Sequence, residues 1–220
     1  MTYNIIGSGS SGNATIVFDH ILIDCGLPFT RIAAYMKEIQ LVLLTHEHSD
    51  HFNPSTVRKL HELRPLVRFA CCEWMAPHLI SSGIKASKID VLEPDQSYAY
   101  GPIWVEPFRL PHDVPNCGWK IYRTGMTPLG KWWDEKLFYA TDASSLDGIE
   151  AKNFDLYMIE MNYGEAEIQE RIARKIEAGE FIYETRALNN HLSEEQALAW
   201  LQQNGPNSKF IPMHQHIDKG

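Results

Sequence analysis

Short runs of apolar and β-branched residues recur along the chain, separated by polar, glycine-rich or proline-containing segments. Runs of this length, bounded by turn residues, are typical of buried β-strands. They predict strands over the following ranges: Tyr3–Ile6, Ala14–Phe18, His20–Asp24, Leu41–Thr45, Val67–Ala70, Ile103–Leu110, Trp119–Tyr122, Lys136–Thr141, Leu156–Ile159 and Lys209–Met213.

Helical patterns lie between some of these strands. One covers Thr56–Leu63, just after Pro54, which suits the first turn of a helix. Another begins at Ser193, where Gln196 completes a capping box. A third carries isoleucine at every fourth position: Ile168, Ile172 and Ile176. Strands first, then helices interleaved with strands, predict an α/β protein with two mixed sheets sandwiched between outer helices.

One interval, Thr124–Asp134, breaks the pattern. It contains Gly125, Pro128 and Gly130 and is predicted to be irregular. The adjacent pair Trp132 and Trp133 fits stacking on a base or a dimer interface. It fits equally well one core and one surface aromatic at a strand edge, and the sequence leaves the choice open.

Length and composition are those of an ordinary globular protein. The chain has 220 residues, 44% of them hydrophobic and 22% charged, and no linker divides it, so we expect a single domain over residues 1–220. No stretch is long enough to cross a bilayer, and the N-terminus lacks a signal-peptide pattern, which predicts a cytoplasmic protein. The four cysteines form no CxxC pair, so free thiols are expected, with Cys25 as a small core residue.

The net charge of −8 counts against tight, non-specific binding to nucleic acid, because such binding depends on Lys and Arg contacts with phosphates. There is no basic run. Bound metal ions would nevertheless add positive charge locally, so the net charge alone does not decide the substrate.

The segment Thr45–His51 reads Thr-His-Glu-His-Ser-Asp-His and directly follows the predicted strand. Imidazole and carboxylate groups are ligands for divalent metals such as zinc. His46 and His48 alternate and so point the same way from an extended backbone, whereas Asp50 and His51 follow where the chain turns and suit a second ion. We therefore predict a metal site at this strand end.

With this His-x-His-x-Asp-His pattern, the chain resembles the metallo-β-lactamase fold hydrolases. Within them it is most similar to the YycJ-type and RNase Z-like phosphodiesterases, and also to phage anti-Pycsar enzymes that hydrolyse cyclic nucleotides. The resemblance extends over nearly the whole chain through three further motifs: Gly7–Asn13, Leu22–Gly26 and Asn190–Ser193. It implies the αββα architecture of that fold, with two mixed β-sheets flanked by helices.

The resemblance also implies the rest of a two-metal site. His112 would complete the first site with His46 and His48. Asp142 would bridge both ions, and His214 would join Asp50 and His51 on the second ion. The ions would be two divalent metals, zinc in the first place and manganese as the alternative. His216, two residues beyond His214, is a weaker rival for the same role.

Other residues near these motifs are expected to support the site rather than bind metal. Asp24 resembles the family aspartate that orients the ligand loop through hydrogen bonds. Gly9, Gly12 and Asn13 fit a sharp turn at the base of the site or an ordinary hairpin turn. The remaining histidines have no such context and are expected on the surface or on helices: His20, His61 and His78.

By the same resemblance, the attacking group would be a hydroxide shared by the two ions. His191 matches the histidine that distinguishes phosphodiesterases from β-lactamases, and it would protonate the leaving oxygen. Glu160 matches a glutamate that pairs with this histidine, although Met161-Asn162-Tyr163 departs from the RNase Z pattern. The candidate catalytic residues are therefore His191, Glu160 and Asp50.

The reaction expected is phosphodiester hydrolysis by a binuclear enzyme. The chain lacks an inserted domain and an obvious substrate-binding arm, and with its acidity this places small cyclic nucleotides slightly ahead of DNA or RNA. A YycJ-type 5′–3′ DNA exonuclease or RNase Z-like nuclease is the alternative. A thiolester hydrolase or lactonase of the glyoxalase type follows, and a metal-binding scaffold comes last. The expected setting is the cytosol of a bacterium or of a phage-infected host, and a homodimer is kept open.

Overall fold

The computed structural model describes the whole chain except residues 127–128, 183 and 216–220. The described residues form two compact units, Met1–Tyr98 and Ala99–Gly220. Each unit has its own β-sheet and its own hydrophobic cluster. The single domain predicted for residues 1–220 stays a prediction.

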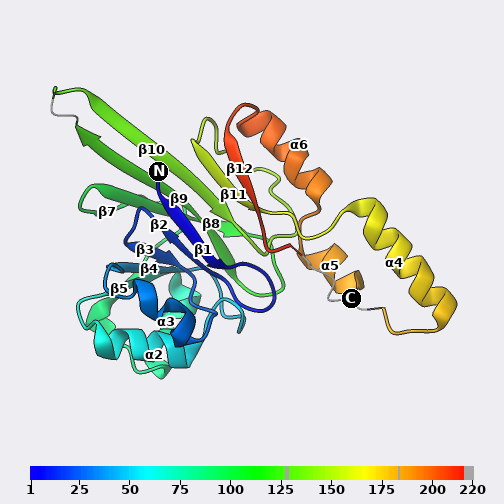
Figure 1. Cartoon of the computed structure of the whole chain (residues 1–220), viewed down its shortest axis with the longest axis horizontal. Helices are drawn as coiled ribbons and strands as arrows, with labels where there is room; N and C mark the ends of the chain where they lie inside the picture. Colours follow the sequence, from blue (N-terminus) through cyan, green and yellow to red (C-terminus); the bar gives the residue numbers. More distant parts are fainter. Residues whose placement is uncertain (127–128, 183, 216–220) are drawn as a thin grey trace. The chain divides into compact units, whose positions relative to one another are not determined.

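The first unit is built on a six-stranded sheet in the order β1-β2-β3-β4-β5-β6 (Figure 1). Strands β1, β2 and β3 pair antiparallel, and β3, β4, β5 and β6 pair parallel. The strands have these bounds: β1 Tyr3–Gly7, β2 Ala14–Val17, β3 Ile21–Ile23, β4 Leu41–Leu44, β5 Arg68–Cys71 and β6 Ile89–Val91. The sheet is therefore mixed.

Helices cover one face of this sheet. They are α1 (Phe29–Ile32), α2 (Pro54–Leu63) and α3 (Ala76–Ser81), with 3₁₀ turns at Ala33–Tyr35, Glu73–Met75 and Ala86–Lys88. The hydrophobic cluster joins the helices to alternate strand positions, among them Val57, Leu60, Leu79, Val42 and Leu44. The intervening strand residues Leu41 and Leu43 are buried as well. A strand buried on both faces reads as a continuous apolar run, which is how β4 looks in the sequence.

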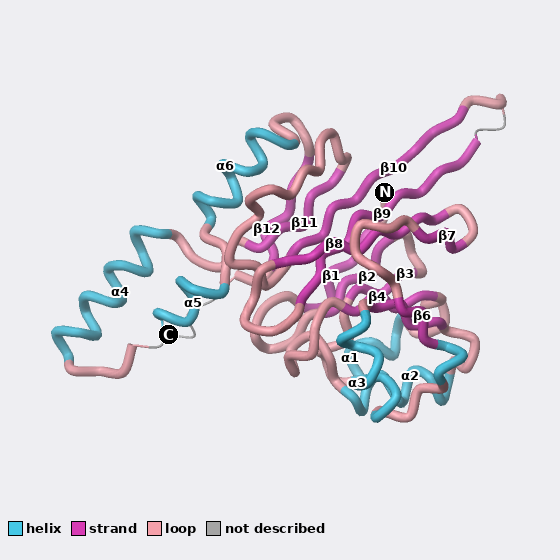
Figure 2. The backbone as a smooth tube through the Cα atoms, turned by 180° about the vertical axis from the view of Figure 1, so that it is seen from behind, coloured by secondary structure: helices cyan, strands magenta, loops and turns pink. Residues whose placement is uncertain are grey.

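The second unit holds a six-stranded sheet in the order β12-β11-β10-β9-β8-β7, and Figure 2 draws its strands in magenta. Strands β8, β9 and β10 pair antiparallel, whereas β10, β11 and β12 pair parallel. The bounds are β7 Tyr98–Tyr100, β8 Ile103–Leu110, β9 Asn116–Met126, β10 Trp132–Ala140, β11 Leu156–Glu160 and β12 Lys209–Met213.

Its helices are α4 (Glu165–Ala178), α5 (Glu184–Asn190) and α6 (Glu194–Asn204). Helix α6 begins with the predicted capping box between Ser193 and Gln196 and packs on the sheet. Trp200 of α6 stacks on Phe138 of β10 with ring centroids 4.9 Å apart. In α4 the predicted isoleucine stripe is buried only at its start, because Ile168 is 1% exposed and Ile176 is 62% exposed.

The predicted fold class, α/β with two mixed sheets and flanking helices, is confirmed. The predicted strands are present, and the short strands β6 and β7 and helices α1, α3 and α5 were not foreseen. These missed elements are three to seven residues long, too short to establish a period in the sequence. The four cysteines are buried and free, and Cys25 belongs to the core as expected. No helix among the described residues is long and apolar enough to cross a membrane.

The prediction of an irregular interval over Thr124–Asp134 is wrong for most of its described residues. Strand β9 continues to Met126 and β10 starts at Trp132, so the two strands form a hairpin that extends beyond β8 and β11; Pro128 lies outside the described residues. Trp133 pairs across the hairpin with Gly125. Because glycine has no side chain, the indole of Trp133 fits over residue 125. Trp132 is 71% exposed, so one tryptophan packs and the other faces outward.

Candidate metal site

The first group of predicted site residues lies at one edge of the first unit's sheet. Strands β3 and β4 run parallel, so the loops after their carboxyl ends lie side by side. Asp24 follows β3, and Thr45–His51 follows β4. Strand β2 runs antiparallel to β3, which brings Asn13, just before β2, to the same edge. The topology therefore gathers residues from three loops.

Asp24 is fully buried and orients the histidine loop, as predicted. Its carboxylate accepts hydrogen bonds from the backbone N–H of Thr45 at 3.0 Å and from its hydroxyl at 2.9 Å. It also lies 2.7 Å from Nδ1 of His51. With the Nδ1 proton held by the carboxylate, Nε2 is the nitrogen left to act as a ligand. The backbone of Asp24 is left-handed, with φ of 59°.

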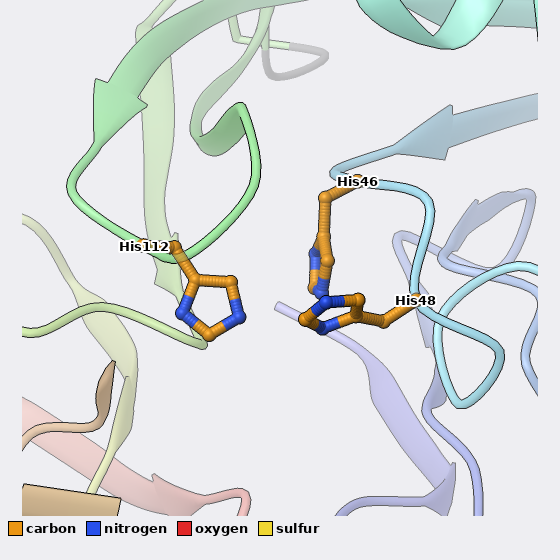
Figure 3. A group of neighbouring side chains, drawn as sticks. All are labelled: His46, His48 and His112. Atoms are coloured by element: carbon orange, nitrogen blue, oxygen red, sulfur yellow. The ribbon is translucent and has the colours of Figure 1, made fainter. Parts of the chain in front are cut away.

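The predicted ligands of the β4 loop lie close together. The ring of His46 is 4.8 Å from that of His48 and 4.2 Å from that of His51, measured between centroids. Asp50 places a carboxylate oxygen 3.8 Å from Nε2 of His51. Figure 3 shows the side chains of His46 and His48 on this loop. One short loop thus brings together three imidazoles and one carboxylate.

The turn at Gly9–Asn13 packs under this loop. Gly9 and Gly12 have φ of 123° and 132°, values that glycine adopts more readily than other residues. The Asn13 amide group donates to the carbonyls of Gly9 and Asp50 and lies 2.8 Å from Nε2 of His51. The sequence predicted the sharp turn, and the structure adds that the side chain of Asn13 contacts the ligand loop.

The second group lies at one edge of the second unit's sheet. Strands β8, β10, β11 and β12 all point the same way, so their carboxyl ends share an edge. His112 follows β8, Asp142 follows β10, Glu160 ends β11 and His214 follows β12. Asp142 and His214 both have left-handed backbones, with φ of 56° and 50°. Residues with a Cβ rarely adopt this conformation, and such outliers cluster at functional sites.

Glu160 lies at the centre of this group. Its Oε1 is 2.7 Å from Nδ1 of His191 and 3.1 Å from Nδ1 of His214. Its Oε2 accepts from the backbone N–H groups of Ala143 and Leu192. The predicted pairing of Glu160 with His191 is therefore present, and the same carboxylate also orients His214. Because both rings are held at Nδ1, both are set to work through Nε2.

The pKa values in this group follow from these contacts. Burial by itself would raise the pKa of Glu160, but hydrogen bonds from His191 and His214 outweigh it and hold that pKa below the ordinary value. Burial would lower the pKa of His191, but the hydrogen bond and charge of Glu160, helped by Asp142, raise it overall. The pair therefore favours a carboxylate beside an imidazolium.

His112 has the opposite tendency. Burial lowers its pKa, which favours the neutral ring that a metal ligand needs. Its Nδ1 donates to the backbone carbonyl of Asn190 over 3.1 Å, and its ring lies edge-on to that of His191 with centroids 5.5 Å apart. Figure 3 shows His112 on the loop after β8. Asn190 immediately precedes His191, so this hydrogen bond links the side chain of His112 to the backbone next to His191.

The donor set fits divalent transition metals, because it combines imidazole nitrogens with carboxylates. Within the second unit, ligand atoms of Asp142, Glu160, His191 and His214 all lie within 4.8 Å of one another. Nε2 of His214 is 3.5 Å from Oδ1 of Asp142. Two donors about 2.1 Å from a tetrahedral ion would lie roughly 3.4 Å apart, so this spacing accommodates an ion. In the first unit, an ion at Nε2 of His51 would have to replace the contact with Asn13.

The remaining histidines lie where the sequence suggested. His61 is on α2 and His78 is on α3, where it pairs with Glu47, while His20 lies in the turn before β3. His216, the rival of His214, lies outside the described residues. Sequence reasoning missed Asn116 and the side chain of Asn162, both of which contact predicted site residues. Their only sequence signal was a position near a strand end.

Residues 19–215 match the family described as the beta-lactamase superfamily domain. Among curated proteins, the chain is similar to exodeoxyribonuclease WalJ of Streptococcus pneumoniae strains D39 and R6, at 26% identity over 176 residues. That alignment covers 73% of this chain and 62% of the relative, so the chain spans less than two thirds of the length of these relatives.

Solved structures show the same fold at low identity. The metallo-β-lactamase fold protein YhfI from Bacillus subtilis matches with a TM-score of 0.70 at 17% identity, covering 98% of this chain and 86% of that one. The short form of human tRNase Z matches with a TM-score of 0.70 at 14% identity, covering 98% and 92%.

The close approach of Gly26 to the ligand loop yields a prediction. A Cβ at residue 26 would lie 1.8 Å from the carbonyl oxygen of Asp50 and 2.8 Å from the nitrogen of His51. We expect Gly26→Ala to push this loop outward, to cost about 1–3 kcal/mol or more in unfolding free energy, and to weaken metal binding. Denaturant unfolding and metal analysis would measure both effects.

Gly164→Ala is the matched control, because its Cβ would approach no closer than 3.9 Å to Glu167. This control should keep the metal content of the wild type. Full metal content in Gly26→Ala would show that the loop tolerates displacement, contrary to this expectation.

Proposed function

We propose that this chain, which belongs to the β-lactamase superfamily, is a binuclear metal-dependent phosphodiesterase that acts on DNA. The family is one of hydrolases. The observation that carries the reaction type is the pair of His191 and Glu160, 2.7 Å apart, at the strand edge that also holds Asp142 and His214. This pair supplies a proton donor beside candidate metal ligands.

The ligand assignment follows the family motif. His46, His48 and His112 would hold the first ion. Asp50, His51 and His214 would hold the second ion, and Asp142 would serve both. The ions, once bound, would supply positive charge to the phosphate and lower the pKa of the attacking water. Zinc is the first candidate on donor chemistry, with manganese as the alternative.

The protein's own proton chemistry follows from the contacts of His191. Nδ1 is held by Glu160, so Nε2 is the atom that gives a proton to the leaving oxygen. The charge of Glu160 supports the imidazolium before the proton is given, and the buried backbone donors at Ala143 and Leu192 keep this carboxylate in place. Asp50 is proposed to act as a ligand that faces the attacking water.

This proton donor argues against the glyoxalase-type alternative. A thiolate leaves without prior protonation, because a thiol has a pKa near 8.5. An alkoxide leaving from phosphorus has a much higher proton affinity and benefits from a positioned acid. A thiolester hydrolase would therefore have no need for a buried carboxylate dedicated to His191. A scaffold without activity would have no need for it either.

DNA is preferred as substrate because the curated relatives are exodeoxyribonucleases and because the alignment with them covers most of this chain. This reverses the order given by the sequence, which placed cyclic nucleotides first. The net charge of −8 favours the second candidate, a small cyclic nucleotide. An exonuclease that contacts only the few phosphates near a strand end tolerates such a charge, since few counterions are involved.

The first prediction from this proposal concerns metal content. The purified protein should carry close to two transition ions per chain, and Asp142→Ala should lower the occupancy of both sites because a bridging ligand serves both. Elemental analysis after exhaustive dialysis measures this. Asp147→Ala, in the same loop but exposed, is the control and should keep both ions. A single ion in the wild type, or two in Asp142→Ala, would contradict the assignment.

The second prediction concerns His191. His191→Ala should keep its metals and lose roughly 10²–10⁴ in kcat on substrates with a poor leaving group. The loss should shrink on bis(p-nitrophenyl) phosphate, whose leaving group departs without a proton. His20→Ala, outside the site, serves as the control. Equal losses on good and poor leaving groups would assign phosphate binding to His191 instead, and lost metal would make it a ligand.

The third prediction separates the substrates. One preparation would be assayed on linear DNA, closed circular DNA, cyclic mononucleotides and a thioester at several salt concentrations. An exonuclease should release nucleotides from linear DNA and spare closed circles, and its KM should rise only modestly with salt because it contacts few phosphates. Turnover of cyclic nucleotides, and none of DNA, would replace DNA by the second candidate.

A further inference from the structure

Three buried asparagines each donate a side-chain hydrogen bond to the backbone carbonyl of a proposed metal ligand. Asn162 donates to His214 at 2.8 Å, Asn116 to Asp142 at 2.6 Å, and Asn13 to Asp50 at 3.2 Å. These asparagines are at most 8% exposed. The same arrangement therefore recurs on three separate loops.

In two of these cases the ligand has a strained backbone. His214 has φ of 50° and Asp142 has φ of 56°. The left-handed region is sparsely populated for residues with a Cβ, so the surrounding structure must hold each peptide in place. A hydrogen bond to the ligand's own carbonyl fixes the peptide plane directly after the ligand, and it does so at the point of strain.

The amide of Asn162 has a defined orientation. A carbonyl accepts but does not donate, so the NH₂ group must face the carbonyl of His214. The same nitrogen lies 3.2 Å from Nδ1 of His214, which is also 3.1 Å from Glu160. The carboxylate forms the stronger, charge-assisted bond with an Nδ1 proton. Asn162 therefore acts on the backbone of His214, while Glu160 sets the tautomer of its ring.

Asn116 is oriented in the same way, although its amide oxygen makes no hydrogen bond among the described residues. Its NH₂ group donates to the carbonyls of Thr141 and Asp142, and among the described residues its buried Oδ1 has no hydrogen-bond partner. Leaving a buried acceptor unsatisfied is unfavourable. Since Oδ1 contributes no hydrogen bond, the two bonds donated by the NH₂ group are what fix the orientation of the amide. Asparagine also suits this place because it is neutral and does not compete for the ion as aspartate or histidine would.

We propose that Asn162 and Asn116 are positioning residues that hold His214 and Asp142 in their left-handed conformations and thereby set the affinity for the metal ions. The inference rests on the proposed function, in that His214 and Asp142 must be ligands. It gives a role to Asn162, which departs from the RNase Z pattern. Asn116 should affect the binding of both ions because Asp142 would serve both, whereas Asn162 should affect the binding of one.

A matched control exists in the same unit. Asn204 is 7% exposed and donates to a carbonyl, that of Trp200 in α6, which is not a ligand. Asn162→Leu, Asn116→Leu and Asn204→Leu all remove an amide of similar burial. Their zinc dissociation constants would be measured by chelator competition on the full chain, and the unfolding midpoints of the metal-free proteins would be compared.

We expect all three variants to lower the unfolding midpoint and only two to weaken zinc binding, by about 10–100-fold. Asn162→Leu should weaken one zinc site and Asn116→Leu both. In a His214→Ala background, Asn162→Leu should cause no further loss, because the two residues act as one unit. If a leucine variant does not fold, Asn162→Ala or Asn116→Ala, which removes the donor without adding a group that could bind the ion, takes its place with the same expectation.

Wild-type affinity in Asn162→Leu and Asn116→Leu would overturn the inference, as would an equal loss in Asn204→Leu. An added loss in the His214→Ala background would also overturn it, because the effect would then be general destabilisation. The proposed function fails in a different way. If His214→Ala itself binds zinc as tightly as the wild type, the ligand assignment is wrong.

Discussion

A buried carboxylate between two imidazoles organises the second unit's site. Glu160 accepts from the loop after β10, from the segment before α6, and from two histidines on different segments. A buried charge is tolerated only where its lone pairs are satisfied, and here four contacts satisfy them. The arrangement of Asp142, His191 and His214 depends on this one group, because moving it would release three loops at once.

The first unit uses the same device. Asp24 is also a fully buried carboxylate at a strand end, and it accepts from Thr45 and holds Nδ1 of His51. In both units a carboxylate at the end of one parallel strand orients a histidine that follows another strand. The two units therefore use one physical solution: a buried anion fixes a tautomer, and the ring works through its other nitrogen.

The aromatic hairpin of the second unit lies away from the chemistry around Asp142. The hairpin of β9 and β10 extends beyond the sheet and exposes Met126 and Trp132, but it lies at the end of β10 opposite to Asp142. Trp133 is bound into the hairpin by Gly125 and by Arg123, whose guanidinium lies 5.2 Å from its ring. Trp133 thus stabilises the hairpin, whereas Trp132 is exposed.

The sequence by itself determined the strands that carry the site and most of the residues at their ends. An apolar run that stops at His46, Asp142 or His214 is a local signal, because a buried strand and its end can both be recognised from residues that are adjacent in the sequence. The pairing of Glu160 with His191 was expected only through the resemblance to RNase Z-like enzymes. The hairpin at Trp132 was not expected, since glycine and proline in Thr124–Asp134 suggested a loop and only pairing across the strands revealed otherwise.

Only the tertiary structure decided what each supporting side chain touches. Asn162 and His214 are 52 positions apart, and Asn116 and Asp142 are 26 apart, so no local pattern relates them. Their contacts exist because parallel strands bring distant carboxyl ends to one edge. The left-handed backbones of Asp142 and His214 could not be predicted from the sequence either, because neither residue type requires a positive φ and the tertiary packing enforces it.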